Sequence, residues 1–213
     1  MFQYTNRRGV TYYLHGHTGR GGTMRYTLKK SPEGALDELP EGYEVVENVN
    51  GQASVRRERP RQITAEEKAA VEADLRRHGL ERYRLEVRDD KLTIYEPDSD
   101  PAAVAGRLGS LLGLSTGLDQ QVEAMVRKQL GDAAMDDFVQ RRERELRNQL
   151  EQMTRYAPVL RFRLVDNQER RFLVARMSYR GEGGWHELDV MPLAEAAERY
   201  LPHLGQESFF DLV

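Results

Sequence analysis

The sequence predicts an α+β fold made of antiparallel β-hairpins interspersed with helices, and two observations lead to this prediction. Pairs of short runs rich in tyrosine, threonine and valine are joined by glycine, asparagine or aspartate, the residues typical of turns. These pairs span residues 10–30, 43–58, 82–97 and 159–180. Segments with helical spacing stand between and after them, and no strand–helix–strand alternation indicates a parallel sheet.

The first two pairs make the first sixty residues rich in β structure. Residues 10–16 and 23–30 flank the loop HTGRGG, whose glycines permit the positive φ angles of a hairpin connection. Further on, Asn50-Gly51 lies between two strand-like runs. An Asn-Gly step predicts a type I′ turn, in which both central residues have positive φ.

A helix and a third hairpin follow. Thr64 as N-cap and Glu67 three residues later form a capping box, and the helix that begins there is expected to end at Gly79. Apolar and charged residues then alternate on both sides of Asp89-Asp90. Such alternation is typical of a sheet that has one face in water.

Helical sequence occupies the middle of the chain. Residues 102–114 predict one helix, and a long charged helix is predicted around 118–156, supported by arginine–glutamate pairs at i,i+4 spacing. Val139, Leu146 and Met153 recur at seven-residue spacing. A coiled coil and a helix packed on its own domain are therefore both open alternatives.

The last part of the chain returns to β structure and closes with a helix. The fourth hairpin is expected to turn at Asp166-Asn167, and a helix to run from Pro192 to Pro202. We predict a β-rich N-terminal module at 1–62 and an α+β main domain at 63–213, with an alternative boundary near 97–101.

Composition excludes several classes of protein. The 213 residues include no cysteine, which rules out disulfides, thiolate nucleophiles and metal sites with cysteine ligands. No apolar run approaches the roughly 18 residues that a membrane span requires, and the first residues lack the apolar core of a secretion signal. We expect a cytoplasmic protein that has no membrane contact and no cofactor.

The segment LHGHTGRGGTMRY raises two hypotheses about chemistry. His15 and His17 point to the same face of a strand and would be the ligands of a metal-dependent enzyme, but no other histidine or carboxylate stands at a familiar spacing. The alternative is a pair of polar residues at the exposed end of a hairpin. The glycines match neither a Walker loop nor G-x-G-x-x-G, so a nucleotide cradle is not predicted.

Two basic regions are candidate contact surfaces. Residues 1–30 carry six basic side chains and no acidic one, with tyrosines among them, which is typical of nucleic-acid contact. Arginines also alternate along both strands of the fourth hairpin and would form a cationic sheet face if the register sets them side by side. The predicted contact residues are Arg7, Arg8, Tyr12, Tyr13, Arg20, Arg25, Tyr26, Lys29, Lys30, Arg161, Arg163, Arg176 and Arg180. Neutralisation by neighbouring carboxylates is the alternative for both regions.

A further candidate is a ligand pocket at Trp185, His186 and Glu187, where an aromatic wall, a titratable base and a carboxylate follow a glycine-rich loop. The alternative is that Trp185 is a core anchor and His186 faces outward. No G-x-S-x-G or H-E-x-x-H motif is present, and we do not expect an enzyme.

These observations lead to one functional prediction and two alternatives. We predict a binding or assembly component that associates with a protein partner or with itself through its charged hairpin and helix surfaces. A nucleic-acid-binding protein that uses residues 1–30, supported by the arginines of 155–180, is the second hypothesis. A metal-dependent enzyme at His15 and His17 is the third.

Overall fold

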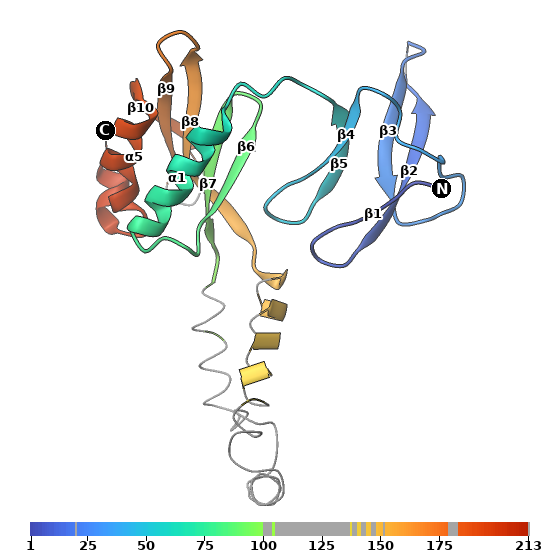
Figure 1. The fold of residues 1–213 in the computed structure, drawn as a ribbon, viewed down its shortest axis with the longest axis horizontal. Helices are drawn as coiled ribbons and strands as arrows, with labels where there is room; N and C mark the ends of the chain where they lie inside the picture. Colours follow the sequence, from blue (N-terminus) through green and yellow to red (C-terminus); the bar gives the residue numbers. More distant parts are fainter. Residues whose placement is uncertain are drawn as a thin grey trace, which may run out of the picture. The chain divides into compact units, whose positions relative to one another are not determined.

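The fold is described by a computed structural model for residues 1–19, 21–99, 104, 137, 140–141, 144–145, 148–150, 152–178 and 183–212. Contacts divide the chain into two units, of which the first comprises Met1–Pro97 and Tyr156–Val213 and the second comprises Asp98–Arg155. The predicted α+β class is confirmed, because antiparallel sheets and helices make up the described residues, with more residues in strands than in helices (Figure 1). The predicted division at residues 62–63 stays a prediction.

The first sixty residues form two small sheets. β1 (Gln3–Thr5), β2 (Thr11–Thr18) and β3 (Met24–Lys29) make a three-stranded antiparallel sheet, and β4 (Tyr43–Glu47) pairs with β5 (Ala53–Arg57). Both predicted hairpins are therefore confirmed. The sequence did not predict β1, since three residues are too few to show an alternating pattern.

The turn at Asn50-Gly51 differs from the prediction. Gly51 has a φ of 74°, but Asn50 does not adopt a positive φ, so the turn is not type I′. Gly51 N donates to the Asn48 carbonyl at 2.9 Å, and Asn48 N donates to the Gln52 carbonyl at 3.1 Å. This is a three-residue hairpin loop with glycine in the left-handed position. It leaves the Asn50 side chain free of the turn, and that side chain bonds both backbone groups of Tyr156, at 2.8 and 2.9 Å.

The largest sheet has five antiparallel strands. They are β6 (Arg84–Arg88), β7 (Lys91–Pro97), β8 (Tyr156–Asp166), β9 (Arg171–Met177) and β10 (Trp185–Pro192), in the order β10-β9-β8-β7-β6. The predicted turns after Arg88 and at Asp166 are confirmed.

Two helices pack on this sheet. α1 (Ala65–Arg77) begins at the predicted capping box, in which Thr64 Oγ1 accepts from Glu67 N at 3.2 Å and Glu67 Oε2 accepts from Thr64 N at 2.9 Å. The same Glu67 carboxylate holds the Arg170 guanidinium from the β8–β9 turn. α5 (Leu193–Tyr200) follows Pro192 as predicted, and two 3₁₀ turns, Leu201–His203 and Glu207–Asp211, complete the chain.

The core lies between these helices and one face of the sheet. Val71 and Leu75 of α1 and Ala196, Ala197 and Tyr200 of α5 are buried. They belong to the same apolar cluster as the inward residues of the central strands, which are Leu92, Ile94, Leu160, Phe162, Leu164, Phe172 and Val174. Since α1 and α5 also contact each other, both helices lie on one side of the sheet (Figure 1).

The second unit contains most of the predicted helical sequence. The helix at 102–114 lies outside the described residues except for residue 104, and the long charged helix around 118–156 lies largely outside them, so it stays a prediction. The described residues from 137 to 153 are helical, and Tyr156 already belongs to β8. Within the part of the chain that is described, no helix has the length and apolar character to cross a membrane.

Candidate functional site

The face of the five-stranded sheet turned away from α1 and α5 is the first candidate site, and we call it the open face. Cross-strand partners share a face, so the register determines which residues lie on it. They are Arg84, Glu86, Arg88, Lys91, Thr93, Tyr95, Pro97, Tyr156, Pro158, Arg161, Arg163, Asp166, Arg171, Leu173, Ala175, Met177, Trp185, Glu187, Val190 and Pro192. Six of these side chains are basic and three are carboxylates, an excess of three positive charges.

Three of the cations lie directly opposite one another. Arg88 of β6 pairs with Lys91 of β7, and Lys91 pairs with Arg163 of β8. We call these three residues the cationic row. Adjacent strands are about 4.7–4.9 Å apart, and like charges directly opposite each other destabilise a sheet. Two carboxylates form ion pairs with the row: Asp90 lies 3.5 Å from Lys91 Nζ, and Glu187 lies 3.8 Å from an Arg163 nitrogen.

Beside the cationic row, an arginine stacks on the chain's single tryptophan. The Arg161 guanidinium lies 4.1 Å from the centroid of the Trp185 ring. The two residues are on β8 and β10, and Arg161 pairs with the small, buried Ala175 of the intervening strand β9. Because Ala175 projects little above the sheet, the Arg161 side chain can reach across β9 to β10.

The environment of the open face disfavours its positive charges. Burial lowers the pKa of Arg161 from its ordinary value, and repulsion from Arg163 adds to this effect, whereas Glu187 and Asp90 oppose it. Arg163 Nε is itself buried and has no hydrogen-bond partner among the described residues. An anion bound beside Arg161 and Arg163 would relieve the repulsion between the two guanidinium groups.

Arg176, one of the two further arginines predicted for this face, lies elsewhere. Arg176 is opposite Leu160, so it lies on the face that carries the core, and its Nε donates to the Leu212 carbonyl at 2.9 Å. The register that would set Arg176 beside Arg161 and Arg163 is therefore not the one observed. Arg180 lies outside the described residues.

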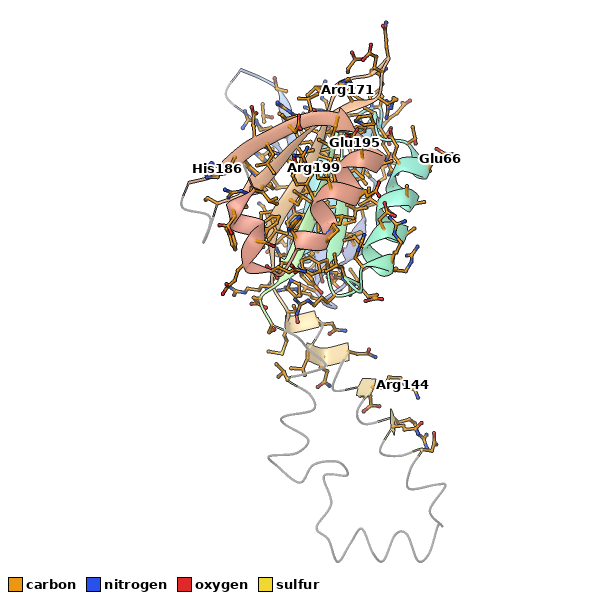
Figure 2. All side chains as sticks on the ribbon, turned by 90° about the vertical axis from the view of Figure 1, so that its left-hand side faces the viewer. Glu66, Arg144, Arg171, His186, Glu195 and Arg199 are labelled. Carbon is orange, nitrogen blue, oxygen red and sulfur yellow. The ribbon has the colours of Figure 1, made fainter. Side chains whose placement is uncertain are left out.

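The predicted pocket at residues 185–187 is divided by the strand. Trp185 and Glu187 lie on the open face, whereas His186 pairs with Arg176 and is exposed on the other side. Figure 2, which views the molecule from the side of α5 and β10, shows His186 at one end of β10, away from Glu195 and Arg199 on α5. Trp185, His186 and Glu187 therefore do not line one cavity.

The contact residues predicted in 1–30 separate into different places. Arg25 and Tyr26 line a hollow of about 460 Å³ together with His17, Tyr43 and Arg57. The Tyr26 and Tyr43 rings meet edge to face at 4.7 Å, and the Arg57 guanidinium lies 5.8 Å from the centroid of the Tyr43 ring. The other predicted residues lie elsewhere on these strands or beside them: Tyr12 and Tyr13 on β2, Lys29 at the end of β3 with Lys30 after it, and Arg7 and Arg8 after β1. Arg20 lies outside the described residues.

The two histidines of β2 differ in their surroundings. His15 is buried, and its Nε2 lies 2.9 Å from the Ser31 carbonyl oxygen, whereas His17 is exposed. Among the described residues, no group of three or more histidines and carboxylates could hold a metal ion. The metal hypothesis therefore has no third ligand in this part of the chain.

Four residues on β6 and β7 complete the open face but were not predicted as site residues, namely Arg84, Arg88, Lys91 and Tyr95. The alternation of charged and apolar residues around Asp89-Asp90 placed them on a wet face, but only the pairing of β7 with β8 brings them beside Arg161 and Arg163. Residues 98–155 separate these two strands in the sequence, so no local signal predicts their pairing.

Comparison of the chain with known protein families, with curated proteins and with solved structures finds no match in any of the three.

Proposed function

We propose that the protein binds single-stranded nucleic acid across the open face of its five-stranded sheet. The observation that carries the proposal is the cationic row of Arg88, Lys91 and Arg163, in which like charges oppose one another on three adjacent strands. A phosphate backbone supplies the negative charge that would stabilise such an arrangement.

The Arg161–Trp185 pair supports the same proposal. Tryptophan and arginine both present flat surfaces on which nucleobases stack, and such stacking contributes about 1–3 kcal/mol per base. A sheet that carries helices on one face and basic and aromatic side chains on the other is also an arrangement used to bind single strands. Phosphate contacts and base stacking would thus come from neighbouring rows of one surface.

Fluorescence anisotropy of labelled oligothymidylate and oligouridylate tests the proposal. The double variant Arg161→Ala, Trp185→Ala is expected to weaken binding at least tenfold. Its matched control is Arg199→Ala, Phe210→Ala, which also removes one arginine and one exposed aromatic ring, but from α5 and the 3₁₀ turn after it. Equal affinities of the two double variants, or no binding by the wild-type protein at low salt, would rule the proposal out.

Assembly through a protein partner is the alternative function, and the same experiment addresses it. A polyglutamate peptide of matched length replaces the oligonucleotide as competitor. If the peptide displaces the oligonucleotide as effectively as unlabelled oligonucleotide does, the open face recognises negative charge alone and an acidic protein becomes the better candidate partner. Self-association would instead give a mass above 24.6 kDa in solution.

A further inference from the structure

A second basic site lies along β6 at the edge of the open face, from which Arg84 and Glu86 contribute to its lining, and it is a cavity of about 690 Å³. Cavities of this volume accommodate small organic ligands. Four basic residues line it, each from a different segment of the first unit: Arg7 follows β1, Arg61 precedes α1, Lys68 lies in the first turns of α1, and Arg84 begins β6.

Only two carboxylates line the same cavity, and both already accept hydrogen bonds. Glu47 accepts from the Tyr4 hydroxyl at 2.7 Å and from Arg7 N at 3.1 Å. Glu86 accepts from Val49 N at 3.4 Å. Four basic side chains and two carboxylates leave an excess of two positive charges in the lining. A phosphate monoester carries about −1.5 to −2 charges at neutral pH, which matches this excess.

Two of the arginines are held in place by one aromatic ring. The guanidinium groups of Arg7 and Arg84 lie 5.8 and 5.9 Å from the centroid of the buried Tyr156 ring. The Asn50 side chain fixes the backbone of Tyr156 at the same point. Burial lowers the pKa of Arg7 from its ordinary value. Glu47 and Tyr156 oppose this shift, and the positive charges of Arg8 and Arg84 add to it. Two arginines set close together by a rigid anchor are suited to a phosphate, whose oxygens accept several hydrogen bonds at once.

Most of the remaining lining is apolar, with Asn48 and Thr64 as its polar members. Val49, Leu85 and Val87 contribute half-buried or buried side chains to the wall of the cavity. A ligand with a phosphate at one end and a flat or apolar group at the other would satisfy both parts of the lining.

We propose that this cavity binds the phosphate monoester of a nucleotide-sized ligand, with Arg7, Arg61, Lys68 and Arg84 around the phosphate and Val49, Leu85 and Val87 against the base or sugar. The ligand is either a free mononucleotide or the 5′-terminal nucleotide of a strand, because both present the same group. The proposal does not depend on binding at the open face.

Isothermal titration calorimetry with AMP, and with adenosine as the probe that lacks phosphate, tests for a free ligand. Oligothymidylates with and without a 5′-phosphate test for a strand end. The test variant is Arg61→Gln, Lys68→Gln, which removes two charges at exposed or half-exposed positions of the lining; its control is Lys29→Gln, Lys30→Gln, which removes the same charge from the β3 region.

For a free nucleotide, we expect the protein to bind AMP but not adenosine. The affinity for AMP should fall about tenfold or more in the test variant and stay unchanged in the control variant. For a strand end, we expect the protein to bind the 5′-phosphorylated oligonucleotide more tightly than the one without a 5′-phosphate. This difference in affinity should disappear in the test variant and remain in the control variant. The proposal is overturned if AMP does not bind and the 5′-phosphate gives no advantage, or if both variants behave alike. Failure of the open face would appear separately, as loss of binding by the oligonucleotide that lacks a 5′-phosphate.

Discussion

Arg161 and Trp185 meet across an intervening strand, with the guanidinium 4.1 Å from the centroid of the indole ring. Stacking of this kind is stronger for arginine than for lysine, since the guanidinium is planar and more weakly hydrated. We expect Arg161→Lys to keep the charge of the open face but to lose the stacked arrangement. The stability of the fold should fall by about 0.5–1 kcal/mol, measured by urea denaturation, and the emission of the single tryptophan should shift. An unchanged emission spectrum would show that Arg161 does not lie on the Trp185 ring in solution.

The cationic row predicts a conflict between stability and binding at Lys91. Lys91→Thr removes the central charge and puts a strand-forming residue in its place, so the sheet should become more stable by about 0.2–1 kcal/mol. The same variant should bind oligothymidylate more weakly than the wild-type protein. Denaturation and anisotropy on one preparation check both effects. Lys29→Thr is the control, because Lys29 is exposed at the end of β3 and should change neither quantity appreciably. A loss of both stability and affinity in Lys91→Thr would mean that the row is not strained.

Salt dependence provides a count of the phosphate contacts. Binding to a single strand weakens with a slope of about −0.7 per neutralised phosphate in a plot of log K against log salt concentration. Three contacts at the cationic row predict a slope of about −2. The slope should become shallower by about 0.7 in Lys91→Thr. A slope near zero would indicate that binding does not involve the phosphates.

Asn50 joins the N-terminal hairpins to the five-stranded sheet. Its side-chain amide donates to the Tyr156 carbonyl at 2.9 Å, and its side-chain oxygen accepts from Tyr156 N at 2.8 Å. Asn50→Ala leaves both backbone groups without these partners, which should lower the free energy of unfolding by about 1–3 kcal/mol. Asn50→Asp retains the acceptor but replaces the donor by a carboxylate oxygen facing a carbonyl, so it should be destabilising too. Gln168→Ala, in the exposed β8–β9 turn, is the control, and a comparable loss there would remove the special role of Asn50.

Tyr83 predicts how stability changes at high pH. Burial, followed by the hydrogen bond to Glu96 at 2.7 Å, raises the pKa of Tyr83 to about 12. In the unfolded chain the pKa of the tyrosine hydroxyl is about 10, so between pH 10 and pH 12 the unfolded state binds fewer protons than the folded state. The contribution of this group to stability is therefore complete below pH 10 and decreases as the pH rises toward 12. Urea denaturation should show a larger loss between pH 9 and pH 11 for the wild-type protein than for Tyr83→Phe, and parallel curves would contradict the shift.

The fold was predictable wherever the signal was local. The capping box of Thr64 and Glu67, the hairpins around Asn50-Gly51 and Asp89-Asp90, and the helix after Pro192 all follow from short patterns that the structure confirms. The type I′ geometry predicted at Asn50 was wrong, because the hairpin closes as a three-residue loop in which Asn50 lacks a positive φ. In this loop the Asn50 side chain bonds Tyr156, a partner 106 residues away. Sequence preferences describe a turn on its own and cannot include such a contact.

The candidate site depended on register, which the sequence does not encode in any short pattern. The alternation along β8 puts Leu160 and Phe162 on one face and Arg161 and Arg163 on the other, and the first pair is buried in the core. A change of one residue in the pairing of β9 would have put Arg176 beside them, but the observed register sets it opposite Leu160. The cationic row required the pairing of β7 with β8, whose residues 97 and 156 meet only in the folded chain.

The fluorescence of Trp185 during titration with unlabelled oligothymidylate at low salt tests the central claim most directly, because Trp185 is the chain's single tryptophan and lies on the open face. If the strand binds the open face, its titration should give saturable quenching that added salt reverses. The affinity obtained from the quenching curve should be at least tenfold lower in Arg161→Ala. Tight binding by anisotropy with no change in Trp185 emission would contradict this claim, since the strand would then lie on another surface of the protein.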